Sequence, residues 1–321
     1  MTSNQHLSLP KRLVINSLFD IISRVNFVFD LNEKKESDFF LNVEKVKNVD
    51  IIGILILYKF IEYAVVKNCF NNPVTNYNHQ SYKINQFVKL FGFEEYFNAY
   101  IKKKDLNKAL NNLDIETSDG FIIAPQVLAK GKIQSKKNFD IKFKKELLSF
   151  YGLELNYFIQ AIMQCAVEIS SNFYSHAKSD TKSIILAKGS KGSVEIACAD
   201  TGDGLLETLK IVEKYSNMSD KKLMVEAFKK DVTSKPNTDH MGYGLWFLKE
   251  IVKRYNGYLD IYSSKTNYSC KFGREKVIDS PNWKGTIVYV NIPVKNGIDI
   301  ADIIKQNRKD TGFQPLINFK K

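Results

Sequence analysis

The most informative segment of the sequence is residues 155–177, LNYFIQAIMQCAVEISSNFYSHA. Apolar residues recur through it without an interrupting Gly or Pro, which predicts a long helix. Glu168, Asn172 and His176 are spaced four apart and therefore share one helix face. A polar stripe in so apolar a segment is costly to bury without partners. An Asn amide oxygen together with phosphate oxygens suits Mg²⁺. The stripe predicts either a metal–nucleotide site or an ordinary solvent-facing side.

A second motif follows a predicted buried strand at 194–199. It reads Asp200-Thr201-Gly202-Asp203-Gly204-Leu205. An acidic residue at a strand end can accept a hydrogen bond from the amine of a purine. The two glycines let the backbone turn tightly beside a flat base. The alternative is a glycine-containing surface turn.

Two further motifs lie nearer the C-terminus. Gly242-Tyr243-Gly244-Leu245 opens a predicted helix at 245–255, and a helix N-terminus is a ready site for phosphate. The alternative there is a simple helix-capping loop. Lys284-Gly285-Thr286 precedes an alternating segment, 287–290, that predicts a strand.

In this order, the four motifs resemble the boxes of the GHKL superfamily of ATP-binding domains. That superfamily includes gyrase-type topoisomerases, heat-shock chaperones, histidine kinases and mismatch-repair ATPases. The resemblance covers roughly residues 145–295. It implies an α+β fold of the Bergerat type, an α/β sandwich with helices on one face of a mixed sheet.

The resemblance also implies a role for each matched residue. Asp200 would accept a hydrogen bond from the adenine amine, with Thr286 beside it through water. Asn172 would ligate Mg²⁺ between the phosphates, and Glu168 would be the general base. Residues 242–245 would hold the phosphates, and 231–241 would form the ATP lid. The residues it assigns to ATP are Asn172, Asp200, Gly202, Gly204, Lys235, Gly242, Tyr243, Gly244, Leu245 and Thr286.

The resemblance does not decide which reaction the protein carries out, because the superfamily includes both kinases and ATPases. The type most similar to this chain is the anti-sigma-factor serine kinase. We therefore expect an enzyme that hydrolyses ATP or transfers its γ-phosphate to a protein acceptor, in a regulatory role. The alternative is a catalytically slow, nucleotide-gated interaction switch. Upstream, His6 and His79 lack the pattern of a phosphoacceptor histidine, which disfavours a sensor kinase. The short C-terminal tail disfavours the topoisomerase and mismatch-repair classes.

The N-terminal half is similar, more faintly, to STAS domains over roughly residues 35–100. The similarity rests on a predicted strand at 39–46, the sequence DIIG at 50–53 and a helix after it. Ile51 and Ile52 stand where such domains carry a phosphorylatable serine, so a docking or sensing role is expected. The predicted domains are 1–138, a smaller α/β STAS-like unit, 139–295, the ATP-binding unit, and 296–321, a tail. The boundary is placed in a basic loop at 129–138.

The other elements expected from patterning are of ordinary length. Helices are predicted at 51–67, 81–97, 207–230 and 298–306, a helix followed by a strand at 13–31, and strands at 74–77, 120–124, 183–187, 193–199, 258–263 and 285–292.

Composition excludes several classes. The 321 residues are 44% hydrophobic and 26% charged, which is typical of a globular protein. No apolar run is of membrane-spanning length and no secretory signal is evident, and the four cysteines form no CxxC pair. A cytoplasmic protein without a membrane partner is expected. The net charge of +12 is spread along the chain, which favours a solvated lysine-rich surface over nucleic-acid binding. The protein partner and a homodimer are left open.

Overall fold

The computed structural model describes residues 5–31, 39–42, 45–67, 69, 73–74, 120–128, 133–176, 183–234, 242–295, 299–303 and 305. Within these ranges, the side chain of His176 is not among those described. The predicted helix at 81–97 and most of the lid, including Lys235, lie outside the described residues. In the described part of the chain, no helix is long and apolar enough to cross a membrane.

A five-stranded sheet forms the centre of the molecule, in the order β6-β7-β8-β10-β9. Each neighbouring pair is antiparallel, so the expectation of a mixed sheet is wrong for these strands, while the α+β class is confirmed. The bounds are β6 Gly120–Leu128, β7 Ser183–Ser190, β8 Ser193–Ala199, β9 Tyr258–Lys271 and β10 Arg274–Pro293.

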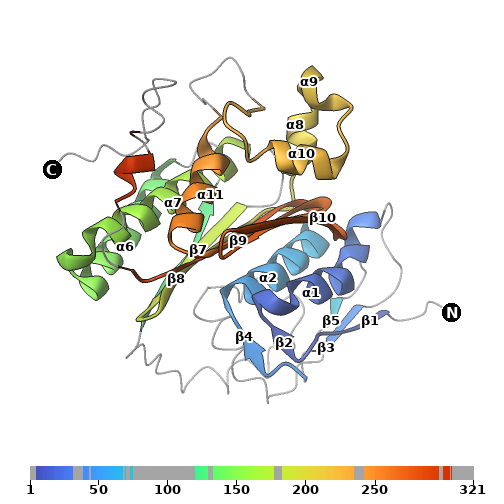
Figure 1. Ribbon diagram of the computed structural model, residues 1–321. Coiled ribbons are helices and arrows are strands. Elements are labelled where there is room, and N and C mark those ends of the chain that lie inside the picture. The colour runs from blue at the N-terminus through green and yellow to red at the C-terminus, as the bar shows by residue number, and fades with distance from the viewer. Residues whose placement is uncertain are drawn as a thin grey trace.

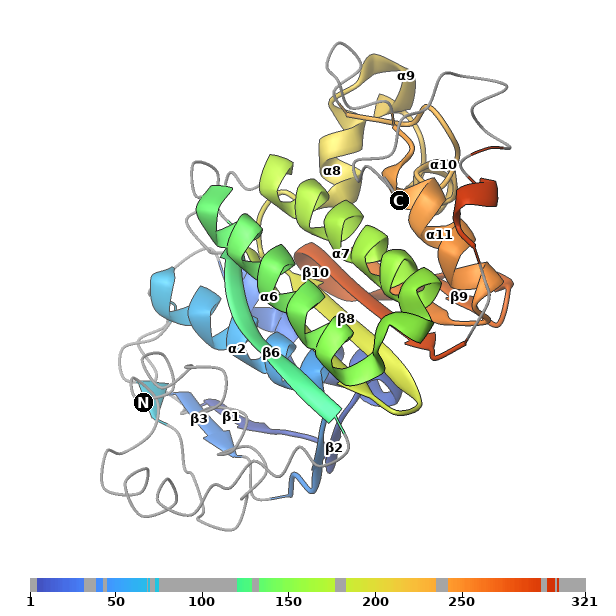
Figure 2. The same ribbon diagram turned by 90° about the vertical axis from the view of Figure 1, so that its left-hand side faces the viewer.

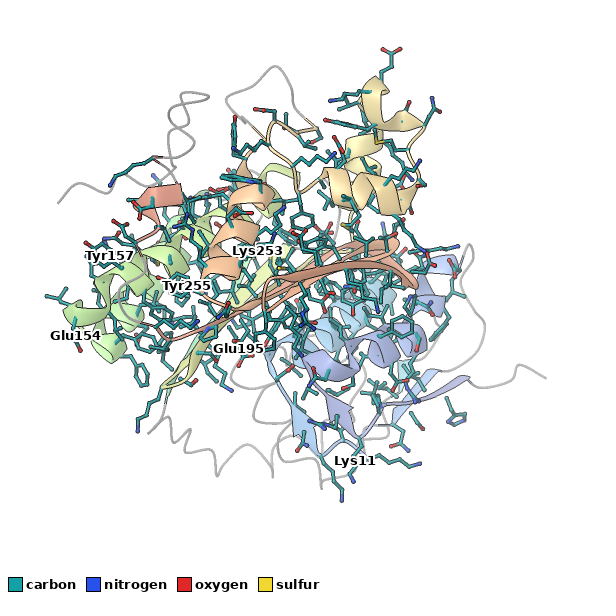
Figure 3. The ribbon with its side chains drawn as sticks, viewed as in Figure 1. Lys11, Glu154, Tyr157, Glu195, Lys253 and Tyr255 are labelled. Carbon is teal, nitrogen blue, oxygen red and sulfur yellow. The ribbon has the colours of Figure 1, made fainter. Side chains whose placement is uncertain are left out.

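Three helices cover one face of this sheet: α6 (Ile133–Tyr151), α7 (Asn156–His176) and α11 (Gly244–Arg254). Figures 1 and 2 show them as one layer. Period-2 alternation in the strands sends Ile185, Ile196 and Val288 into the core on this side. The C-terminal end of α11 is tied to α7, because the Tyr255 hydroxyl donates to the carbonyl of Tyr157 at 3.4 Å (Figure 3).

The opposite face is covered by N-terminal elements. These are α1 (Leu18–Val25), the 3-10 helix η2 (Asn26–Asp30) and α2 (Ile51–Val66), seen below the sheet in Figure 1. Alternate strand residues such as Leu186, Ala197 and Tyr289 join a second apolar core with them. Helices therefore lie on both faces. Those of the expected ATP-binding unit, α6, α7 and α11, share one face, whereas the cover of the other face by the N-terminal helices was not expected. The sheet needs two covers because both sides of its central strands are apolar.

Asp50 fixes the start of α2. Its carboxylate accepts hydrogen bonds from the backbone N–H groups of Gly53 and Ile15, both at 2.8 Å. The first is a helix-capping contact. Two small parallel sheets flank these helices. One is β1 (Gln5–Ser8), β3 (Phe39–Asn42) and β5 (Pro73–Val74), and the other is β2 (Arg12–Leu13) with β4 (Asn48–Val49).

Several local expectations differ from the structure. The strand expected at the end of 13–31 is the 3-10 helix η2, preceded by η1 (Ile15–Ser17) and α1. The helix expected at 207–230 is three short helices, α8 (Leu205–Lys210), α9 (Glu213–Ser216) and α10 (Asp220–Glu226).

The loop expected at 129–138 is wrong in its second half, because α6 begins at Ile133. The predicted domain boundary at 138/139 lies inside α6. Strand β6, which precedes this boundary, belongs to the central sheet. Between α6 and α7 is a 3-10 turn, η4 (Leu153–Leu155).

Candidate functional site

Asp200 directly follows β8 and is held in a fixed position by neighbouring backbone groups. Its Oδ1 accepts hydrogen bonds from the N–H groups of Gly202 and Thr286, each at 3.0 Å. Its own N–H donates to the Thr286 carbonyl at 3.0 Å. Among the described residues, no hydrogen bond reaches Oδ2. One carboxylate oxygen is therefore anchored and the other is left to accept a hydrogen bond.

Gly285 makes this arrangement possible. Its φ of +100° is one that L side chains rarely adopt, and a Cβ there would lie 2.3 Å from Asp200 Oδ1. Thr286 accepts the Leu205 N–H on its hydroxyl at 2.8 Å. That bond ties β10 to the first residue of α8, just after Gly204. Two segments far apart in the chain thus bring together the residues that were expected to surround the purine base. We call this group, Asp200, Gly202, Gly204 and Thr286, the base end of the site.

Burial raises the pKa of Asp200 above its ordinary value. The hydrogen bonds from Gly202 and Thr286 act against this, because they stabilise the carboxylate. The positive charge of Lys59, on α2 behind the sheet, also lowers the Asp200 pKa, whereas the charge of Asp203 raises it. These donors favour the charged form of Asp200, but burial outweighs them, so the pKa of Asp200 stays above its ordinary value.

The second group of residues lies where α7 meets the start of α11. A Cβ on Gly244, the first residue of α11, would lie 2.7 Å from Glu168 Oε2 and 3.6 and 3.7 Å from the two amide atoms of Asn172. A side chain at this position would have to displace the end of the Glu168 carboxylate. Glu168 and Asn172, four residues apart, therefore face the same helix N-terminus, as their spacing predicts.

Glu168 is buried, with 6% of its surface exposed. Burial raises its pKa to about 7, while a hydrogen bond from Gln164 and the charge of Lys136 lower it. Gln164 Nε2 donates to Glu168 Oε1 at 2.7 Å. Lys136 lies on α6 and donates to Ser171 Oγ at 2.7 Å. A carboxyl that titrates near neutral pH can both accept and release a proton under cellular conditions.

The segment before α11 places the remaining expected residues. Gly242 lies beside the backbone of residues 231–232, and Tyr243 caps α11 with its ring buried. Leu245 is partly buried against the helix-side core. Near the helix start, the Lys230 ammonium lies 4.8 Å from the centre of the Trp246 ring.

An Asn amide oxygen is a possible ligand for a magnesium ion that arrives with phosphate. Among the described residues, no group of three or more His, Cys, Asp or Glu could hold a metal. Mg²⁺ keeps several waters and needs only one or two protein oxygens when phosphates supply the others. The Asn172 amide, beside the space that Gly244 leaves by lacking a Cβ, is a donor of this kind.

Four residues of the two groups were not expected from sequence. Ser263 donates to the Gly285 carbonyl at 3.1 Å, and Trp283 donates to the Asp200 carbonyl at 2.9 Å. Gln164 donates a hydrogen bond to Glu168, and the charge of Lys136 acts on the same carboxylate. The spacing of Gln164, four residues before Glu168, is a signal that would have found it, since it extends the same helix face. The other three act across long sequence separations that no local pattern reports.

Comparison with known proteins leaves this geometry to be interpreted through its own chemistry. A scan against protein-family models and a search of curated proteins both gave no match. The function is therefore inferred from the two groups of residues described above.

Proposed function

We propose that this protein binds ATP with Mg²⁺ and hydrolyses it, or transfers its γ-phosphate to a protein acceptor. The observation that carries the proposal is the close approach of Gly244 to Glu168 and Asn172. At a helix N-terminus, backbone N–H groups without intrahelical partners favour phosphate. A buried carboxyl and an amide beside such a terminus provide a base and a metal ligand at the place where phosphate would bind.

The base end supports adenine as the recognised group. Asp200 Oδ2 is the oxygen without a hydrogen bond among the described residues, and adenine presents an exocyclic amine that can donate to it. Gly202 and Gly204 line the turn that follows, where the absence of side chains leaves room for a flat ring. Leu245 and Tyr243 contribute the backbone at the opposite, phosphate end.

Asn172 would hold Mg²⁺, which when bound would neutralise phosphate charge. Glu168 would take the proton from an attacking water or acceptor hydroxyl. As the new bond to the γ-phosphorus forms, the bond to the β–γ bridging oxygen breaks and ADP leaves. The Glu168 pKa of about 7 suits this role, because the group is substantially ionised at neutral pH.

These roles are those of a GHKL-type domain with a Bergerat-type fold, most similar to the anti-sigma-factor kinases. The antiparallel sheet with α6, α7 and α11 on one face supports the assignment. The N-terminal elements would serve as a STAS-like docking or sensing module for the protein partner. Lys235 would contact phosphate from the lid.

The test is incubation of the full chain with γ-labelled ATP and Mg²⁺, following free phosphate and label on protein. Glu168→Gln should abolish turnover while ATP still binds. The matched control is Glu154→Gln, which changes an exposed glutamate in the turn between α6 and α7 (Figure 3).

Each outcome assigns or removes part of the proposal. Released phosphate indicates an ATPase, and label on an added or endogenous protein indicates a kinase. Bound ATP without either product supports the nucleotide-gated switch. A wild-type protein that binds no ATP overturns the proposal, and turnover that survives Glu168→Gln overturns the role of Glu168 as base.

A further inference from the structure

Trp283 holds the backbone of Asp200 from the back of the sheet. Its side chain is fully buried, and its indole N–H donates to the Asp200 carbonyl at 2.9 Å. The pairing of β10 with β9 is irregular on both sides of Trp283, between Asp279 and Trp283 and again between Trp283 and Thr286. Trp283 lies in the back-face core, and the backbone N–H of Thr286, three residues later, bonds the Asp200 carboxylate.

The indole is itself packed against the N-terminal elements. Phe29 of η2 meets the Trp283 ring edge-on, with ring centres 5.1 Å apart. Tyr63 of α2 meets Phe29 in the same way at 5.0 Å. We call Trp283, Phe29 and Tyr63 the aromatic triad. Lys284 closes the arrangement, since its ammonium donates to the Tyr63 hydroxyl at 3.3 Å. Edge-on pairs of this kind fix ring orientation as well as burying area.

A buried charge on α2 lies behind the same strand end. Lys59 is fully buried and forms an ion pair with Glu62, one helical turn further on. α2 packs against β7 and β8, and the charges of Lys59 and Asp200 act on each other. In an otherwise apolar helix, such a buried ion pair contributes little net stability.

We propose that Trp283 is a positioning residue for the base end of the nucleotide site, and that the N-terminal elements, acting through the aromatic triad, set its selectivity for adenine over guanine. The proposal rests on the proposed function, since it concerns the same site. Adenine offers an amine where guanine offers a carbonyl oxygen. A fixed carboxylate accepts from the first and repels the second, whereas a carboxylate free to shift loses that discrimination.

The experiment compares ATP and GTP affinity, by calorimetry on the full chain, for wild type and three variants. Trp283→Phe keeps a ring but removes the N–H donor. Phe29→Leu breaks the triad without touching Asp200. Phe27→Leu is the matched control, because Phe27 also lies on η2 and packs against Phe60 of α2, with ring centres 6.3 Å apart.

Trp283→Phe should weaken ATP binding about tenfold and leave GTP binding unchanged, as expected when a buried carbonyl loses its donor. Phe29→Leu should shift the ATP/GTP ratio in the same direction by a smaller factor, and Phe27→Leu should not. General destabilisation would weaken both nucleotides alike.

A wild-type protein that binds no ATP overturns the proposed function. A wild type that prefers ATP, with the ATP/GTP ratio unchanged in Trp283→Phe and Phe29→Leu, overturns the positioning role alone. If Trp283→Phe fails to fold, as judged by circular dichroism, Phe29→Leu decides the question.

Discussion

Substituting alanine at Gly285 should both destabilise the fold and disable the base end of the site. The new Cβ would lie 2.3 Å from Asp200 Oδ1 and 2.5 Å from the Asp200 carbonyl oxygen. To reach an ordinary contact, Asp200 must move by about 1 Å, since carbon and oxygen rarely approach closer than roughly 3.3 Å. That shift would break the hydrogen bonds that Oδ1 accepts from Gly202 and Thr286.

Alanine substitutions at two other glycines separate the backbone strain from the loss of hydrogen bonds. Gly273 has a φ of +78° but open space where its Cβ would be, and Gly192 has open space and no such φ. Gly192→Ala should therefore be nearly neutral, and Gly273→Ala should cost about 1 kcal/mol of backbone strain. Gly285→Ala adds the loss of two hydrogen bonds at about 1 kcal/mol each, which makes about 3 kcal/mol in total.

Urea unfolding gives the three free energies, and calorimetry gives ATP affinity for each variant. Gly285→Ala should lose ATP binding, whereas the other two variants keep it. The reasoning is refuted if Gly285→Ala is no less stable than Gly273→Ala and binds ATP as well as wild type.

Three further substitutions follow from the same structure. Gln164→Leu removes the donor that stabilises the Glu168 carboxylate, so the acidic limb of the turnover–pH profile, expected near pH 7, should move to higher pH; a shift to lower pH would contradict this. Lys59→Met leaves Glu62 buried without its cation and should cost about 3–5 kcal/mol in urea unfolding, whereas Lys59→Met with Glu62→Leu should recover most of that cost. Gly244→Ala should lower turnover more than ATP affinity, because its Cβ would displace Glu168 Oε2; equal losses would argue against that placement.

Elements with local signals could be predicted from sequence. The helices predicted at 155–177, 245–255 and 51–67 correspond to α7, α11 and α2. Asn256 adopts a φ of 52°, the left-handed conformation common at helix ends. These features depend on neighbours within one or two helical turns, which the sequence displays directly.

The long β9–β10 hairpin could not be predicted in the same way. Only the parts farthest from its turn, 258–263 and 285–292, alternate visibly, and the segment between them is rich in polar residues. Buried polar side chains in the hairpin are bonded to each other, as in the bond from Asn267 to Asp260 within β9. Pairing across the sheet depends on partners distant in sequence, so strand propensity alone misses it.

The two faces of the sheet were misjudged for a related reason. Residues 51–66 are apolar nearly all round, and such a helix has to be covered on more than one side. The placement of Glu168 near Asn172 follows from helix spacing, but the approach of Gly244 to both depends on how α11 packs against α7.

The sheet with helices on both faces has a consequence for any attempt to divide the chain. A fragment beginning at residue 139 would lack edge strand β6 and part of α6, and it would lack the cover of α1 and α2. Its back face, with Ala197, Tyr262 and Trp283, would then meet water as one continuous apolar surface. Such surfaces drive association between molecules. The part of the chain that holds Glu168 and Asp200 should therefore be expressed and studied together with its N-terminal cover.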